Sequence, residues 1–283
     1  MTAHELAPAK VNLSLHVTGQ RADGYHLLDS MVVFTQAGDL LEEVAPETGL
    51  VIAGPEGAGL TTGPENLVSR AALLMGVSEP ALRLVKNLPV AAGIGGGSSD
   101  AAATLRLLAR ITGKPLPPMQ EILALGADVP ACLAGAPCRM QGIGEVLTLL
   151  PPLPPFWLVL VNPRVAVSTP QVFRSLNNRN NAPMPADLPH WPDVYALADW
   201  LHGQRNDLEA PARALAPVIS QVLRALAENP DCALARMSGS GATCFGIFPT
   251  EQAASAAAQM VQERHPDWWV VATGIRAPRA LIS

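Results

Sequence analysis

Pro89-Val90-Ala91-Ala92-Gly93-Ile94-Gly95-Gly96-Gly97-Ser98-Ser99-Asp100 joins a strand-like segment to an amphipathic helix through four glycines and two hydroxyl residues. Glycine has no Cβ, so backbone N–H groups can approach an anion, and the following helix start offers unpaired N–H groups and a positive dipole end. The segment therefore predicts a phosphate-binding loop, with a plain connecting turn as the alternative. A Walker A loop needs a lysine directly before Ser98, and a dinucleotide fingerprint needs a glycine in place of Ser98, so both are excluded.

The composition favours a globular protein that binds small molecules. The chain has 283 residues, of which 49% are hydrophobic and 15% charged, enough for one large domain or two ordinary ones. Its net charge of −5 offers no basic surface for nucleic acid or an anionic membrane. The first ten residues lack an apolar h-region, and no stretch reaches the roughly 18 apolar residues of a membrane span. We expect neither secretion nor membrane insertion.

The cysteines suggest a reducing compartment. Cys132, Cys138, Cys232 and Cys244 form neither a Cys-x-x-Cys pair nor a cluster with zinc spacing. We expect reduced thiols without a metal or redox role, in a cytoplasmic protein.

A proline-rich segment predicts a domain boundary. Residues 151–155 read Pro-Pro-Leu-Pro-Pro, and four prolines in five positions form a stiff extended connection rather than a helix or central strand. We expect an N-terminal domain over residues 1–150 and a C-terminal domain over residues 156–283.

The hydrophobic pattern predicts helices and strands mixed within both domains. Expected strands cover residues 11–17, 31–34, 39–44, 49–53, 82–88, 156–161, 233–237, 244–248 and 268–275. Expected helices cover residues 65–75, 98–111, 119–125, 169–176, 206–228 and 250–264, with an exposed loop over 177–192. Because the second half shows no regular strand–helix alternation, the expected fold class is α+β.

Two further motifs accompany the glycine segment. Pro8-Ala9-Lys10-Val11-Asn12-Leu13 reads as a strand that places Lys10 and Asn12 on one face. Met237-Ser238-Gly239-Ser240-Gly241-Ala242 predicts a glycine turn between two strands that can close over a ligand. In this order and with these separations, the three motifs closely resemble the signature motifs of the GHMP kinases, named for galactokinase, homoserine kinase, mevalonate kinase and phosphomevalonate kinase.

This resemblance covers essentially the whole chain and implies both a fold and an activity. The fold is a two-domain α+β GHMP kinase fold, with an ATP-binding N-terminal domain and the active site in the cleft between the domains. The activity is transfer of the γ-phosphoryl group of ATP to an alcohol, with Mg²⁺ as the accompanying ion.

Two segments resemble one branch of the family, whose acceptor is the 2-hydroxyl of a cytidine-diphosphate-linked methylerythritol, an isoprenoid precursor. They are Gly-Gln-Arg-Ala-Asp-Gly-Tyr-His at residues 19–26 and Leu-Gly-Ala-Asp-Val-Pro at residues 125–130. One alternative is another GHMP kinase with a mevalonate- or homoserine-type acceptor, which carries no base for Tyr25 and His26 to bind. The other is a catalytically inactive nucleotide sensor, which the presence of Lys10 and Asp128 disfavours.

The resemblance also implies roles for individual residues. A tertiary alcohol is a poor nucleophile, so the site needs a base near its proton and a cation near the phosphoryl group. We expect Asp128 to be the base and Lys10 the cation. The structural alternative is that Asp128 is an acidic residue of a turn and Lys10 a solvent-exposed lysine of a strand. For ATP, the matching positions are Asn66 and Lys86 at the nucleoside and Gly93, Gly95, Gly96, Gly97, Ser98 and Ser99 at the phosphates. For the acceptor they are Asn12, Tyr25, His26 and Phe173, with Tyr25 and Phe173 stacking on cytosine and His26 reading its edge.

Several positions keep a structural alternative. Asn66 suits a helix N-terminus, and Asp100 suits a first helical turn, where an acid stabilises the helix dipole. The segment Asn206-Asp207-Leu208-Glu209 resembles a family segment but is also typical of helix capping. The sequence assigns neither the metal ligands nor the oligomeric state.

Overall fold

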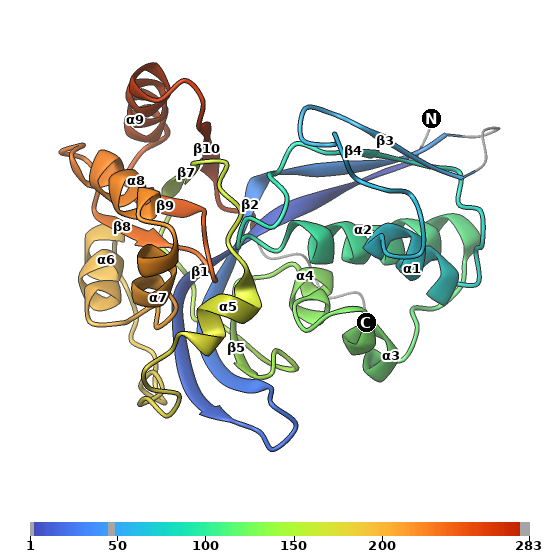
Figure 1. Ribbon diagram of the computed structural model, residues 1–283, viewed down its shortest axis with the longest axis horizontal. Helices are drawn as coiled ribbons and strands as arrows, with labels where there is room; N and C mark the ends of the chain where they lie inside the picture. Colours follow the sequence, from blue (N-terminus) through green and yellow to red (C-terminus); the bar gives the residue numbers. More distant parts are fainter. Residues whose placement is uncertain (1–2, 45–48, 278–283) are drawn as a thin grey trace.

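The computed structural model describes residues 3–44 and 49–277, whose strands form two sheets (Figure 1). The first has the order β3-β4-β2-β5-β6, with β1 paired to β2. It contains β1 (His4–Gln20), β2 (His26–Glu43), β3 (Leu50–Ala53), β4 (Leu82–Val85), β5 (Cys138–Gly142) and β6 (Val146–Leu149). The second has the order β10-β7-β9-β8 and contains β7 (Trp157–Asn162), β8 (Leu234–Met237), β9 (Cys244–Phe248) and β10 (Trp269–Gly274).

A long antiparallel hairpin of β1 and β2 runs between the two halves of the molecule (Figure 1). Its turn contains the expected Asp-Gly pair, with Gly24 at φ +91°. The expectation of a separate strand over residues 39–44 is wrong, because residues 39–43 belong to β2. Pairing of β2 with β1 shifts its register between Phe34 and Gly38 and then continues, so the strand extends past the polar residues at its middle.

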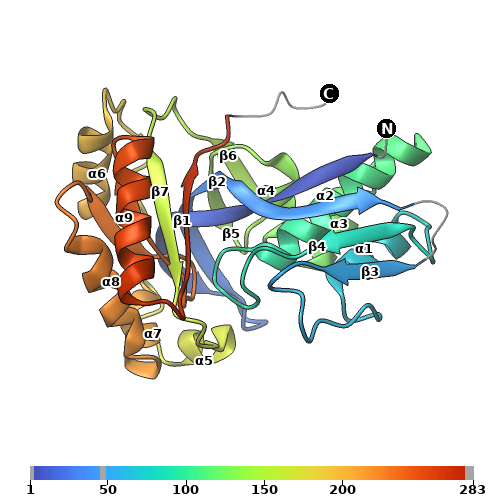
Figure 2. The same ribbon diagram turned by 90° about the horizontal axis from the view of Figure 1, so that it is seen from above.

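The helices lie in two groups (Figure 2). Four accompany the first sheet: α1 (Leu67–Leu74), α2 (Gly96–Thr112), α3 (Met119–Leu125) and α4 (Val129–Ala134). Five accompany the second: α5 (Thr169–Arg174), α6 (Val194–His202), α7 (Glu209–Leu215), α8 (Val218–Ala227) and α9 (Glu251–Arg264). The expected single helix over 206–228 is two helices, because Pro217 has no N–H to continue the ladder. Within the described ranges, no helix is both long and apolar enough to cross a membrane.

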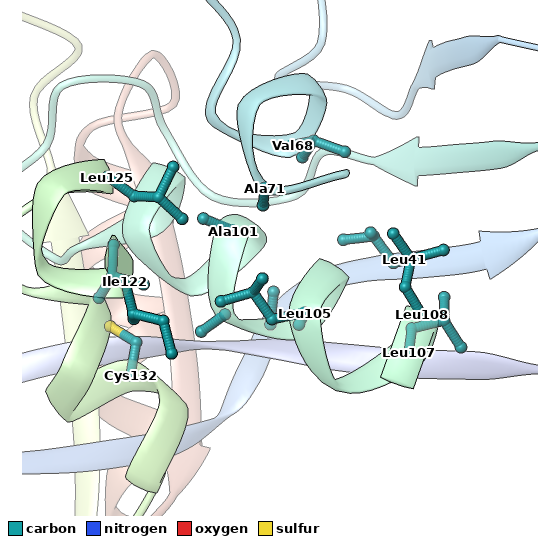
Figure 3. Close-up of a cluster of buried hydrophobic side chains, with 14 of the residues drawn as sticks. Leu41, Val68, Ala71, Ala101, Leu105, Leu107, Leu108, Ile122, Leu125 and Cys132 are labelled. Carbon is teal, nitrogen blue, oxygen red and sulfur yellow. The ribbon is translucent and has the colours of Figure 1, made fainter. Parts of the chain in front are cut away.

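The helix α2 is packed on several sides by the first half of the molecule (Figure 3). Its Ala101 and Leu105 belong to the same buried cluster as Ala71 of α1 and Ile122 of α3. The consecutive residues 101–103 are all alanine and fully buried, so neighbouring elements approach the helix closely. This packing fixes the direction in which the helix start points.

The two halves share a core along the hairpin. One buried cluster joins Val11 and Val33 of the first sheet to Leu158 and Phe245 of the second. All strands of the first sheet precede residues 151–155 and all strands of the second follow them, and this proline segment lies in no helix or strand. The two sheets therefore pack into one molecule in which β1 and β2 contact both.

The segment 177–192 is the expected loop and most of its residues are exposed, but it is anchored at two buried side chains. Met184 and Trp191 are only 2% and 3% exposed. Arg139 forms a bidentate pair with Asp29 and donates to the carbonyl oxygens of Met184, Pro185 and Ala186. The middle of the segment is thus anchored to β2 and β5.

Candidate active site

A cavity of about 570 Å³ lies where the three motifs meet. The predicted residues that line it are Lys10, Asn12, Asn66, Lys86, Gly93, Gly95, Gly96, Gly97, Ser98, Asp128 and Phe173. Its wall also includes Gly239 and Ser240 of the third motif, so both halves of the chain contribute to it. The cavity therefore lies between the two halves, where the sequence led us to expect the active site. The predicted residues Tyr25, His26 and Ser99 are not part of this wall.

The glycine segment has a backbone that only glycine adopts readily. Gly93 and Gly95 have φ values of +74° and +63°, and Gly95 is the N-cap of α2. A Cβ on Gly93 would lie 2.6 Å from the carbonyl oxygen of Ser238. Because α2 begins at Gly96, two residues earlier than expected, the residues of its first turn, Gly96, Gly97 and Ser98, belong to the cavity wall. Unpartnered N–H groups at a helix start form an anion site.

Ser99 has a buried structural contact. Its hydroxyl donates to the carbonyl oxygen of Pro8 at 2.6 Å, and its side chain is fully buried. This hydrogen bond ties α2 to β1 beside Lys10. The backbone N–H of Lys10 in turn donates to the carbonyl oxygen of Ile94 at 2.9 Å, so the first motif and the glycine segment are joined twice.

Lys10 and Asp128 form an ion pair in the cavity wall. Lys10 Nζ lies 2.6 Å from Asp128 Oδ1, and the two side chains are 4% and 33% exposed. Asp128 occupies the N-cap position of α4, yet its side chain accepts no capping hydrogen bond. Its carboxylate is therefore paired with a buried cation on one side and open to the cavity on the other.

The third motif is fastened to the first two through Ser238. The Ser238 hydroxyl accepts from the backbone N–H of Asn12 at 3.1 Å and donates to the carbonyl oxygen of Gly93 at 3.0 Å. The Asn12 side chain donates to Ser30 Oγ at 2.7 Å, which fixes its orientation in the wall. One buried hydroxyl thus connects all three motifs.

The segment 206–209 also holds the third motif, which the capping interpretation did not foresee. Asn206 Oδ1 accepts from the N–H of Leu208, as a cap would, but Asn206 Nδ2 donates to the carbonyl oxygens of Met237 and Gly239. Glu209 accepts from the N–H of Met237 at 3.1 Å. No local pattern signals these contacts, because the partners lie far apart in the sequence.

An aromatic pair lies next to the cavity. The rings of His26 and Phe173 stack with centroids 4.5 Å apart, while Tyr25 is 58% exposed. His26 Nε2 is buried and makes no hydrogen bond within the described part of the chain. Burial, followed by the charge of Arg179, lowers the pKa of His26, so its ring is neutral at pH 7.

Two further residues of the cavity wall, Asn66 and Lys86, have partners within the protein. Asn66 accepts from the N–H of Val68 at 2.9 Å, which confirms the helix-capping alternative for its side chain. Lys86 Nζ contacts the carboxylates of Asp39 and Asp100, a buried cluster that the sequence did not reveal. The expectation that Asp100 stabilises the helix dipole from the first turn is wrong, since α2 begins at Gly96 and its first turn holds no acid.

Comparison with known proteins agrees with this geometry. A family model described as "GHMP kinases N terminal domain" matches residues 66–147, and one described as "GHMP kinases C terminal" matches residues 187–267. The chain is 59% identical to the 4-diphosphocytidyl-2-C-methyl-D-erythritol kinase of Dinoroseobacter shibae, over 95% of this chain and 94% of that protein. The chain belongs to the GHMP kinases. A second GHMP kinase of the same name, from Ruegeria pomeroyi, is 55% identical over 95% of this chain and 98% of its own length.

Solved structures place the fold in the same family. The structure titled 4-(cytidine 5'-diphospho)-2C-methyl-D-erythritol kinase has a TM-score of 0.76 and 35% identity, covering 96% of this chain and 99% of its own. Homoserine kinase from Cytophaga hutchinsonii has a TM-score of 0.62 at 17% identity, over 98% of this chain and 96% of its own, and shares the fold alone. This GHMP kinase has the two-domain α+β fold and is an ATP-dependent small-molecule kinase.

Proposed function

We propose that this GHMP kinase transfers the γ-phosphoryl group of ATP to the 2-hydroxyl of 4-diphosphocytidyl-2-C-methyl-D-erythritol, a step in isoprenoid precursor synthesis. The observation that carries the chemistry is the Lys10–Asp128 ion pair, which faces the same cavity as the start of α2. The acceptor follows from relatives that bear this substrate in their name at 59% and 55% identity.

In the proposed reaction, the acceptor oxygen attacks the γ-phosphorus while the bond to the β–γ bridging oxygen breaks and ADP leaves. The hydroxyl proton passes to Asp128, whose carboxylate is open to the cavity. Lys10 stabilises the negative charge on the transferring group, and the backbone N–H groups at Gly96 and Gly97 hold the phosphates of ATP.

We also propose that Mg²⁺ accompanies ATP. Within the described residues, no group of three or more His, Cys, Asp or Glu side chains could hold a metal ion. A kinase needs no such group of protein ligands, because Mg²⁺ in kinase sites is held mainly by phosphate oxygens and water, with one or two carboxylates. The ion would neutralise charge on the phosphates. We further place the enzyme in the cytoplasm, where thiols such as those of the unbonded cysteines stay reduced.

The acceptor's base is proposed to bind at the aromatic pair. His26 covers one face of Phe173, and Phe173 also lines the cavity. Tyr25, adjacent in sequence to His26, is exposed enough to close over a base. The unpartnered His26 Nε2 is the atom available to the edge of cytosine, since a neutral imidazole can donate or accept one hydrogen bond there.

Replacing Tyr25 tests this base site. Tyr25→Ala is expected to weaken acceptor binding by about 1–3 kcal/mol, because one stacking surface is lost, with the KM for ATP unchanged. Tyr25→Phe keeps the ring and serves as the matched control. Steady-state kinetics with each substrate varied in turn measures both constants, and an unchanged acceptor KM in Tyr25→Ala would mean that the base binds elsewhere.

Competition by cytidine diphosphate tests the function without a variant. This compound carries the base but not the reacting alcohol, so we expect it to compete with the acceptor and not with ATP. The mevalonate- and homoserine-type alternatives predict no competition with the acceptor, because their acceptors have no base. A nucleotide sensor predicts no ADP release at all.

A further inference from the structure

Three ionisable side chains meet beneath the start of α2. Lys86, which follows β4, contacts Asp39 of β2 and donates to Asp100 Oδ2 of α2 at 2.9 Å. All three side chains are at most 5% exposed. Lys86 and Asp100 also line the cavity, and a Cβ on Gly96 would lie 3.2 Å from Lys86 Nζ. The cluster therefore lies directly under the first residue of the helix that faces the phosphates.

The two carboxyl groups of the cluster have different surroundings. Asp39 Oδ1 accepts from the backbone N–H groups of Asn87 at 2.6 Å and Leu88 at 2.8 Å, so this oxygen has two donors in addition to the contact of the carboxyl with Lys86. Asp100 Oδ1 is buried and accepts no hydrogen bond from a donor within the described ranges. Both carboxyl groups contact the same ammonium, Lys86 Nζ, so they lie close together in the buried cluster. Two buried carboxylates with one buried cation between them leave one negative charge without a partner, so one of the two groups needs a proton.

The charge count gives the proton to Asp100. One buried ammonium balances one carboxylate, and the carboxylate with backbone donors is Asp39. Burial raises the pKa of Asp100 to about 8, and the charge of Asp39 adds to this against the lowering effect of Lys86. For Lys86, burial acts downward, but Asp100 and Asp39 together leave its pKa raised.

We propose that Asp100 is a positioning residue that must carry a proton for ATP to bind well. With that proton, the cluster under the helix start is neutral. Without that proton, the cluster carries a net negative charge next to the proposed phosphate site, which weakens the binding of an anion such as ATP. The two neighbouring carboxylates then also repel each other, which disturbs the packing beneath Gly96. The inference rests on the proposed ATP site at the glycine segment, and it adds a proton-dependent control of that site.

The other charged groups of the cavity wall do not determine the protonation of Asp100. Lys10, Glu65 and Asp128 come from β1, the segment before α1 and the segment before α4. The charges that act on Asp100 are those of Lys86 and Asp39. Glu65 is exposed, so it offers a matched control: a carboxylate on the same cavity wall outside the buried cluster.

The test measures ATP binding by calorimetry across pH in the full-length protein and in Asp100→Asn. Asparagine has the size of the neutral acid and keeps an acceptor for Lys86 and a donor for Asp39. Above the pKa of Asp100, the wild-type Kd for ATP is expected to rise by up to roughly tenfold per pH unit. In Asp100→Asn this rise should disappear, whereas Glu65→Gln should retain it. Binding of the acceptor should show no such change in any of the three.

Thermal stability gives a second readout that needs no ligand. The pKa of Asp100 is about 8 in the folded protein and about 3.9 for an unfolded aspartate. Between these values only the folded state holds the proton, so this group's stabilising contribution falls as pH rises through the window. The Tm of Asp100→Asn relative to wild type should therefore increase from about pH 4 to about pH 8.

Three results would each overturn the inference. The first is an ATP affinity that does not change with pH in the wild type, and the second is an alkaline loss of ATP affinity that persists in Asp100→Asn. The third is an infrared difference spectrum of these two proteins at pH 7 without a protonated carboxyl band from the wild type. Failure of the proposed function looks different: phosphoryl transfer to the cytidine-linked acceptor would be absent while the pH dependence of ATP binding remained. If ATP failed to bind at every pH, the ATP site on which the inference rests would itself be wrong.

Discussion

Asp128→Asn is expected to lower kcat by about 10²- to 10⁴-fold, because asparagine cannot accept the proton of the attacking hydroxyl. The Lys10–Asp128 contact of 2.6 Å would become a weaker bond from an ammonium to an amide oxygen, so Lys10 stays in place. The fold and ATP binding should be retained, since Asp128 makes no capping bond to α4. Single-turnover rates of phosphoryl transfer, with Kd values for both substrates, measure this effect.

The matched control is Asp193→Asn. Asp193 also precedes a helix, α6, and its side chain accepts from the N–H of Ala196, a contact that asparagine can keep. Its turnover should equal that of the wild type. If Asp128→Asn likewise turned over near the wild-type rate across pH, Asp128 would not be the base, and the open carboxylate would have another role.

Gly95→Val is expected to weaken ATP binding by about 1–3 kcal/mol, or roughly 5- to 150-fold. Gly95 is the N-cap of α2 with φ +63°, a region that a β-branched residue avoids, and its added Cβ would lie 3.1 Å from Lys10 Cβ. The loop is expected to relax away from its binding conformation, so part of the binding free energy of ATP is used to restore that conformation. Calorimetry with ATP and with the acceptor compares the two losses.

Gly113→Val separates this effect from general destabilisation. Gly113 ends the same helix with φ +70°, but no atom lies within 4 Å of its would-be Cβ. Gly113→Val should lower the stability of the protein but leave the ATP affinity of the folded protein unchanged. Equal losses of ATP and acceptor binding in Gly95→Val would indicate misfolding of the whole site and contradict a specific role for the loop.

The sequence predicted the parts of the fold that local chemistry determines. The strand at residues 11–17, the Asp-Gly turn, the helix capped by Thr250 and the glycine segment all follow from short-range patterns, and the structure contains them. It also brought Lys10 and Asp128 into one site through the family's motifs. The ion pair between Lys10 and Asp128 joins two segments that lie far apart in the sequence, so only the structure shows it.

What the sequence could not predict depends on tertiary partners. The sequence predicted two strands, over residues 31–34 and 39–44, but pairing with β1 on both sides of a register shift joins them in the single strand β2. The polar segment 177–192 is mostly exposed, as expected, but no pattern in the sequence indicated that Arg139 of β5 binds its backbone at Met184 and Pro185. The sequence did not indicate that Asp39 and Asp100 form a buried cluster, because their shared partner Lys86 comes from a third segment of the chain.

The most direct measurement is ADP release in a coupled assay with a panel of acceptor alcohols, followed by phosphorus NMR of the product. The panel contains 4-diphosphocytidyl-2-C-methyl-D-erythritol, mevalonate, homoserine and galactose. We expect ATP-dependent turnover with the cytidine-linked compound alone, and a new phosphate ester at its 2-hydroxyl. Turnover with a base-free acceptor, or none with any member of the panel, would contradict the proposed function.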